Sequence, residues 1–227
     1  MNARADRLFL QGAAGAIEAL REMPLNGVAA ESVPPHVPQG PPGVAVIAHP
    51  HPLFGGTMDN KVVQTIARAF VRCGWSAVRF NFRGVGASAG VHDQGRAETE
   101  DFLAVVEQLA PRGALAIAGF SFGAFVASQA LVRLAAARGV GPAGDIRHLV
   151  LVGTAAAHFP VATLPAEMHE HTLIVHGEQD DTVPLAAVLD WARPQALPVT
   201  VVPGCGHFFH GQLPLLTGLV ARHVRAG

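Results

Sequence analysis

The chain has few cysteines: only Cys73 and Cys205 among 227 residues. Two thiols cannot build the disulfide framework of a small secreted domain, and neither lies in a Cys-x-x-Cys or zinc-finger spacing. Twelve histidines are present, and His49, His51, His207 and His210 are the candidates for a metal cluster. No His-Glu-x-x-His motif supports them. We therefore expect the cysteines to pack structurally, and we expect no metal site and no cofactor.

Long apolar runs are also missing. Half of the residues are hydrophobic, yet no run reaches the roughly 18 consecutive apolar residues of a membrane span. The first seven residues carry charge but lead into only a short apolar patch, without the apolar core of a secretory signal. These observations predict a cytoplasmic protein with no membrane partner.

Neither sign of charge is in excess. The formal net charge is −1 at pH 7, and the lysines and arginines are dispersed along the chain. A basic stripe for nucleic acid is therefore absent. A small, neutral or weakly charged molecule is the partner that this composition favours, whereas the oligomeric state stays open.

Apolar segments typical of strands alternate with segments typical of helices along the whole chain. The strands are continuously apolar, which favours a parallel sheet covered on both faces. We predict one domain over residues 1–227 with a doubly wound, mostly parallel α/β sheet. A β-hairpin at residues 7–11 and 16–21 precedes it. The expected strands are 44–48, 75–80, 114–118, 148–152, 172–176 and 199–202, and the expected helices are 60–72, 98–109, 121–138, 185–192 and 212–224.

A Gly-x-Ser-x-Gly pentapeptide, residues 119–123, lies between an expected strand and an expected helix. In that context the motif is a nucleophile elbow, a sharp turn that holds its serine in a strained conformation at the end of the strand. The alternative is an ordinary tight turn that contains a serine. The context favours Ser121 as a covalent nucleophile.

A nucleophilic serine needs a base within hydrogen-bonding distance and an acid that orients the base. Downstream, His176-Gly-x-x-Asp180-x-x-Val183-Pro184 follows an expected strand, and His207 lies in a glycine-flanked loop after the last strand. The order serine, acid, histidine is that of α/β-hydrolases. Asp181 competes with Asp180 because spacing alone does not separate adjacent acids.

The sequence resembles the α/β-hydrolase superfamily over its whole length. The string His49-Pro-His-Pro-Leu-Phe-Gly-Gly-Thr-Met-Asp-Asn-Lys-Val-Val63 resembles a group of small bacterial hydrolases related to dienelactone hydrolases, as do residues 79–86 and 206–209. The resemblance implies Ser121 as nucleophile, His207 as general base and acid, and Asp180 as orienting acid. Dienelactone hydrolases carry cysteine at the nucleophile position, so Ser121 is a departure that puts their substrate in doubt.

Catalysis by such a serine also requires donors for an oxyanion. The N–H of Phe122, the residue after the nucleophile, is one expected donor. The other should come from the loop after the first core strand, where Pro50 and Pro52 have no N–H. His51 or Leu53 must supply it, and alignment with the His-Gly motif of related enzymes favours His51.

We predict a substrate-binding surface of Leu53, Phe54 and Phe208, close in sequence to the proposed site. Residues 153–171 are long enough for a small flap but not for a lid domain. An open site with apolar walls suits small carboxylic esters or thioesters, preferably with short acyl chains.

Other functions remain as alternatives. An acyltransferase or peptidase would use the same three residues, and a non-catalytic binding protein would keep the fold without chemistry. Residues 84–89 fit a dinucleotide-binding Gly-x-Gly-x-x-Ala pattern, but the segment that follows is turn-like rather than an apolar helix. The sequence therefore favours a cofactor-independent serine esterase or thioesterase.

Overall fold

A single eight-stranded sheet organises the residues described by the computed structural model, which are 4–24, 43–141 and 144–226. Its strand order is β1-β2-β4-β3-β5-β6-β7-β8. The first two strands form an antiparallel hairpin, β2 pairs antiparallel with β4, and the remaining neighbours pair in parallel. The predicted doubly wound α/β architecture with an N-terminal hairpin is therefore confirmed. The strands are β1 (Arg4–Gly12), β2 (Gly15–Met23), β3 (Val44–Ala48), β4 (Ser76–Phe80), β5 (Leu115–Phe120), β6 (Ile146–Val152), β7 (Thr172–Gly177) and β8 (Thr200–Val202).

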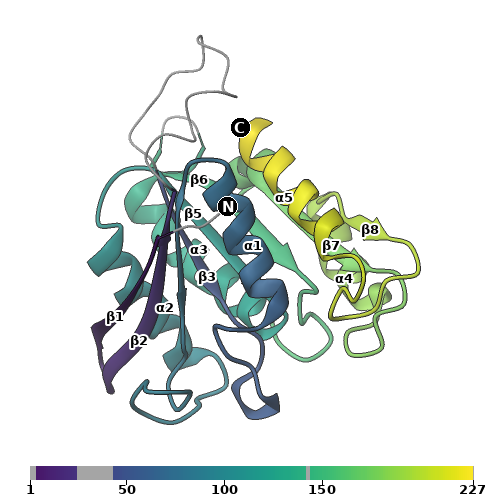
Figure 1. Cartoon of the computed structure of the whole chain (residues 1–227). Helices are drawn as coiled ribbons and strands as arrows, with labels where there is room; N and C mark the ends of the chain where they lie inside the picture. The colour runs from purple at the N-terminus through teal and green to yellow at the C-terminus, as the bar shows by residue number, and fades with distance from the viewer. Residues whose placement is uncertain (1–3, 25–42, 142–143, 227) are drawn as a thin grey trace.

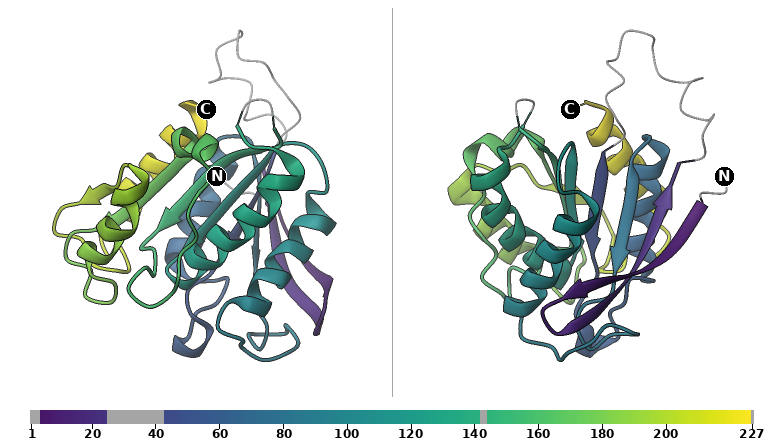
Figure 2. Two further views of the ribbon diagram at one scale, coloured as in Figure 1. Left: turned by 180° about the vertical axis from the view of Figure 1, so that it is seen from behind. Right: turned by 90° about the vertical axis from the view of Figure 1, so that its left-hand side faces the viewer.

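Helices cover both faces of the sheet (Figures 1 and 2). The pair α1 and α5 packs on one face and α2 and α3 on the other, because the central strands are apolar on both sides. The helices are α1 (Lys61–Arg72), α2 (Arg96–Leu109), α3 (Phe122–Arg138), α4 (Leu185–Ala192) and α5 (Leu213–Ala226), with short 3₁₀ turns at η1 (Pro52–Phe54), η2 (Ala166–His171) and η3 (Arg193–Gln195). Within the described ranges, no helix is both long and apolar enough to cross a bilayer.

The topology brings the ends of the parallel strands to one edge of the sheet. The loops after β3 and β4 gather at the lower edge in Figure 1. Ligands bind at this edge in open parallel sheets. The loops after β5, β7 and β8 leave the sheet at the same edge, so the topology gathers there all the segments that carry the predicted site residues.

One histidine of the sheet is buried away from this edge. His148 on β6 packs edge-on against Trp75 and His223, with ring centroids 5.4 and 5.3 Å away. Burial, together with the nearby His223, His171 and Arg147, lowers the pKa of His148 to about 3. The folded state therefore holds this imidazole neutral at pH values where an unfolded chain protonates it.

Stability should fall as the solution is acidified, because the folded-state pKa of His148 lies below the unfolded value of about 6.5. The contribution is complete above pH 6.5 and is lost progressively toward pH 3, by about 2 to 3 kcal/mol between pH 6.5 and 4.5. Urea unfolding of the wild type and of His148→Phe at several pH values measures it. The variant should lose less stability on acidification; an equal loss in both proteins contradicts the assignment.

Candidate active site

Ser121 lies at the end of β5 in a conformation that few non-glycine residues adopt, with φ 57° and ψ −117°. Its N–H donates to the carbonyl of Val152 at 2.9 Å, which ties the turn to β6. A side chain at Gly119 would overlap the backbone of Gly123, so the turn can close only with glycine there. The strand, sharp turn and helix of a nucleophile elbow are therefore present around Ser121.

Ser121, His207 and Asp180 form one hydrogen-bonded chain. His207 Nε2 lies 3.0 Å from Ser121 Oγ, and His207 Nδ1 lies 2.7 Å from Asp180 Oδ2. All three residues are buried, and Ser121 keeps 7% of its surface exposed. Because the carboxylate accepts the Nδ1 proton, Nε2 is left as the acceptor that faces the serine hydroxyl. In this geometry a histidine can take the proton of a serine while an acid orients the imidazole ring.

The loop after β7 fixes the orientation of Asp180. Its Oδ1 accepts the N–H groups of Thr182 and Val183 at 3.0 and 2.7 Å, which leaves Oδ2 for His207. The neighbouring Asp181 is exposed, and among the described residues its carboxylate contacts only the Thr182 hydroxyl, at 3.4 Å. The contact with the histidine is therefore made by Asp180, the acid that the His-Gly-x-x-Asp pattern favours.

A second buried histidine, His176, lies beside the Asp180 carboxylate. His176 Nε2 donates to the Val183 carbonyl at 2.9 Å and lies 3.4 Å from Asp180 Oδ2. Burial lowers the pKa of His176, so its ring is neutral. Burial also pushes the pKa of Asp180 upward, but the hydrogen bonds from His207 and Val183 outweigh that effect and hold the pKa below its usual value. Asp180 is therefore ionised at neutral pH.

The loop after β3 brings one free N–H next to the elbow. His51 Nδ1 accepts the N–H of Leu53 at 3.2 Å, so the Leu53 donor is already engaged. In the described part of the chain, the N–H groups of His51 and Phe122 have no acceptor. The rings of these two residues are in contact, with centroids 4.9 Å apart. Of the two candidates in this loop, the geometry thus favours His51 as an oxyanion donor beside Phe122.

The elbow and this loop can meet because Gly123 has no side chain. A Cβ there would overlap the carbonyl oxygens of Ala48 and His49 at the end of β3. The N-terminus of α3 consequently lies directly against the loop. Its helix dipole, positive at this end, favours a negative charge in the same place.

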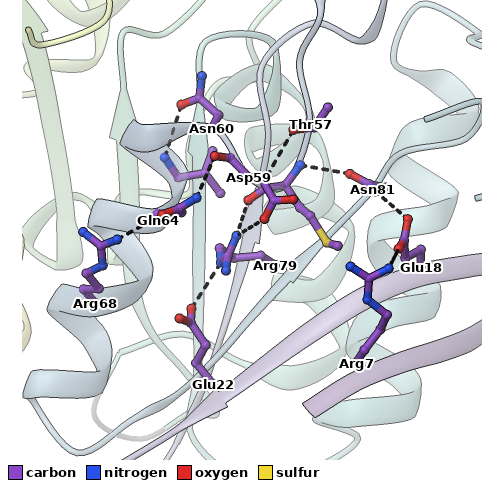
Figure 3. Close-up of polar contacts among 12 residues, drawn as sticks. Arg7, Glu18, Glu22, Thr57, Asp59, Asn60, Gln64, Arg68, Arg79 and Asn81 are labelled. Carbon is purple, nitrogen blue, oxygen red and sulfur yellow. Dashed lines mark hydrogen bonds and ion pairs between the residues drawn. The ribbon is translucent and has the colours of Figure 1, made fainter. Parts of the chain in front are cut away.

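The far end of the loop is held by buried polar side chains (Figure 3). Asn81 Oδ1 accepts the Met58 N–H at 2.9 Å, and Asn81 Nδ2 donates to Glu18 at 2.8 Å. Arg79, on β4, donates to the Met58 carbonyl and to Glu22 and Asp59. The segment between His51 and α1 is therefore anchored to the sheet.

The predicted substrate-binding residues lie at the rim rather than inside the site. Leu53 and Phe54 are 71% and 87% exposed, and Phe208 is half-exposed. Phe54 contacts the His51 ring and Phe208 the His207 ring, with centroids 4.8 and 5.1 Å apart. Their role in binding stays a prediction.

A cavity of about 860 Å³ lies between the start of α2, one side of α3 and residues 158–160. Phe159 lines it and also packs against Phe122 and His51, with centroids 5.1 and 5.8 Å away. The charged side chains in its wall are paired, Arg96 with Asp93 at 3.0 Å and Arg133 with Glu100. Its lining comprises residues 92–96, Thr99, Glu100, Phe125, Gln129, Arg133 and residues 158–160.

Sequence reasoning missed the polar contacts that shape this cavity. Glu98 is fully buried and accepts the N–H groups of Asp93 and Gly95, both at 2.8 Å. His92 is half-buried with Nδ1 2.8 Å from the same carboxylate. Arg83 pairs with Asp101 at 2.8 and 2.7 Å. Only the glutamate at the third helical position signalled a capping role in the sequence.

No group of three histidine, cysteine or acidic side chains within the described residues could hold a metal ion. The four histidines weighed as ligands have other surroundings. His49 is buried with both ring nitrogens engaged, and His207 contacts Asp180 and Ser121. His51 accepts a backbone N–H, and His210 is exposed.

Replacing Gly123 by alanine should destabilise the protein by about 1 to 3 kcal/mol, because the new methyl group must displace backbone on β3. The matched control is Gly218→Ala on α5, where a methyl group enters open space and should stabilise the helix by about 0.5 to 1 kcal/mol. Urea unfolding compares the two variants. Equal stabilities would contradict the close approach of α3 to β3.

Several known proteins are similar to this chain. Residues 28–140 match the family model of the X-Pro dipeptidyl-peptidases (S15 family). The crystal structure of XC6422 from Xanthomonas campestris, a member of the α/β serine hydrolases without lid, has a TM-score of 0.80 and 33% identity, covering 100% of this chain and 96% of that one. An α/β serine hydrolase homologue from Coxiella burnetii has a TM-score of 0.74 and 34% identity, covering 96% of each chain.

A curated relative, the uncharacterized protein RP471 of Rickettsia prowazekii, is 37% identical over 131 residues. The match covers 56% of this chain and 50% of that protein, so it spans half the length of the relative. The two solved structures, by contrast, cover 100% and 96% of this chain.

Proposed function

The chain belongs to the α/β-hydrolase superfamily, and we propose that it is a serine hydrolase that cleaves small carboxylic esters or thioesters through an acyl-enzyme intermediate. The observation that carries the proposal is the hydrogen-bonded chain from Ser121 through His207 to Asp180. The string at residues 49–63 further supports kinship with the small bacterial hydrolases related to dienelactone hydrolases. Two free thiols at Cys73 and Cys205 support a reducing, cytoplasmic location.

In the first half of the proposed reaction, His207 Nε2 takes the proton of Ser121 Oγ while the oxygen attacks the carbonyl carbon of the substrate. The resulting oxyanion accepts the N–H groups of Phe122 and His51. When the intermediate collapses, the bond to the leaving group breaks, and the alkoxide or thiolate receives the proton from His207. The acyl group stays on Ser121.

In the second half, water gives a proton to His207 Nε2 and attacks the acyl carbon. The second tetrahedral intermediate expels Ser121, which recovers its proton from His207, and the free acid departs. Asp180 stays ionised throughout: its Oδ2 accepts the hydrogen bond of the His207 Nδ1–H and stabilises the imidazolium that forms in each half. The low pKa of Asp180 suits this role, because the group must remain charged.

We propose that the acyl group lies toward the cavity beside Phe159. The volume of about 860 Å³ is within the range of small-molecule sites, and Phe125 and Phe159 give its otherwise mostly polar wall an apolar surface. The charged side chains of the wall form ion pairs with each other, so the wall has no excess of charge of either sign. A neutral substrate is therefore favoured over a charged one.

A peptidase is the second candidate, because residues 28–140 match the X-Pro dipeptidyl-peptidase model. Such an enzyme must hold the ammonium group at the free end of its peptide, which requires a carboxylate near the nucleophile. Asp180 is engaged with His207, and Glu98 with two backbone N–H groups. The acids of the cavity wall are paired with arginines. Within the described residues, no carboxylate that lines the cavity is unpaired, which favours an ester over a peptide there.

The triad is tested by comparing the wild type with Ser121→Ala, His207→Ala, Asp180→Asn and Asp181→Asn on p-nitrophenyl acetate. We expect kcat/KM to fall at least about 10³-fold in the first three variants, because each removes one member of a unit that works together. Asp181→Asn is the control and should stay within about threefold, because its side chain is exposed to water. A fluorophosphonate should label the wild type at Ser121 only.

Labelling that persists at full rate in His207→Ala would contradict the triad. The substrate class is read in the same assay from p-nitrophenyl esters of increasing chain length, acyl-CoA thioesters and an X-Pro p-nitroanilide. Short acyl esters or thioesters should be turned over fastest. Turnover of the X-Pro anilide above that of every ester would instead establish the peptidase.

A further inference from the structure

His49 is the residue before the oxyanion loop, and nothing in the proposed reaction uses its side chain. The ring is fully buried between the end of β3 and the start of the loop after β4, and it contacts the Phe82 ring at a centroid distance of 4.6 Å. A polar side chain in such a place is costly unless both ring nitrogens are bonded. The hydrogen-bond partners of the His49 ring therefore indicate its role.

Both ring nitrogens of His49 are engaged, and the partners fix the tautomer. The backbone N–H of Phe82 donates to Nε2 at 3.0 Å, so Nε2 carries no proton. Nδ1 consequently carries the proton of the neutral ring and donates it to the Pro50 carbonyl at 2.6 Å. Burial lowers the pKa of His49 to about 4, so the ring keeps this neutral form near pH 7.

The Pro50 carbonyl belongs to the same peptide unit as the His51 N–H. A trans peptide is planar, so the carbonyl and the N–H point in opposite directions, and no cis peptide occurs in the described chain. The proline ring fixes φ of Pro50, which leaves ψ of Pro50 and φ of His51 as the torsions that turn this plane. A hydrogen bond to the carbonyl oxygen therefore sets the direction of the N–H.

We propose that His49 is a positioning residue: its Nδ1–H holds the Pro50 carbonyl, and thereby aims the His51 N–H at the developing oxyanion. The inference rests on the proposed function. It also explains how a loop with prolines at positions 50 and 52 can present the free N–H of His51. His49 is itself anchored, because the Phe82 N–H that bonds Nε2 lies at the end of the neighbouring strand.

The anchors at the far end of the loop act differently. Asn81 and Arg79 bond the backbone of Met58, seven residues after His51 (Figure 3). They restrain the position of the loop but do not touch the Pro50–His51 peptide. Loss of the His49 hydrogen bond should therefore weaken binding of the transition state specifically. Loss of the Asn81 or Arg79 contacts would instead loosen the whole loop and reduce the fraction of active molecules.

The test compares His49→Asn with His49→Gln. The amide nitrogen of asparagine lies near the position of Nδ1 and can still donate to the Pro50 carbonyl, whereas the longer glutamine places its amide near Nε2 and cannot. Rates are expressed per active site titrated with a fluorophosphonate. We expect kcat of His49→Gln to fall about 10²- to 10³-fold, as for the loss of one oxyanion donor, with KM within about threefold.

His49→Asn should keep kcat within about tenfold of the wild type. The affinity of a boronic acid, which mimics the tetrahedral intermediate, should fall in parallel with kcat across the variants. Equal losses in both variants, or an unchanged boronic acid affinity in His49→Gln, would overturn the proposal. Absence of fluorophosphonate labelling in the wild type would instead refute the proposed function itself.

A measurement on the wild type covers the case in which the variants do not fold. Nitrogen NMR of ¹⁵N-histidine-labelled protein reports which ring nitrogen carries the proton. The proposal requires His49 to be protonated at Nδ1 at neutral pH, and protonation at Nε2 would overturn it.

Discussion

The direct packing of α3 against the end of β3 is the constraint on which the rest of the site depends. Gly123 allows the elbow and the oxyanion loop to approach until their backbones touch. The proposed reaction needs this close approach, because the N–H groups of Phe122 and His51 would have to bind the same small oxyanion. The strain at Ser121, with its positive φ, is maintained by the same packing and by the hydrogen bond to Val152.

Around this contact, each reactive group is oriented by a partner that is itself held in place. The Thr182 and Val183 N–H groups orient Asp180, which orients His207, which faces Ser121. On the opposite side Phe82 orients His49, which holds the Pro50 carbonyl. One row of buried hydrogen bonds thus ends at Ser121, and the other ends at the Pro50–His51 peptide. Preorganisation of this kind lowers the cost of reaching a charged transition state.

Much of the fold was predictable, because strands buried on both faces are continuously apolar and the helices between them are bounded by glycine, proline and polar caps. The expected strand 44–48 and helix 185–192 agree with β3 and α4 residue for residue. Other elements differ by a few residues at their ends, where capping decides. Asn60, for example, caps α1 rather than belonging to it.

The site was less predictable where side-chain direction matters. Spacing could not separate Asp180 from Asp181, because adjacent residues differ only in which way they point. The sequence also could not distinguish Leu53 from His51 as an oxyanion donor, because it does not show that the Leu53 N–H donates to the His51 ring. The role of His49 depends on the backbone N–H of Phe82, which is distant in sequence, and no sequence motif records that contact.

The central claim is that catalysis proceeds through an acyl group on Ser121. Rapid quenching of the protein during turnover of a p-nitrophenyl ester, followed by intact-mass and peptide mass spectrometry, tests it directly. The account predicts a transient mass increase of one acyl group, located on Ser121 and absent after the ester is exhausted. Turnover of the ester with no acyl adduct, or with the adduct on another residue, would contradict it.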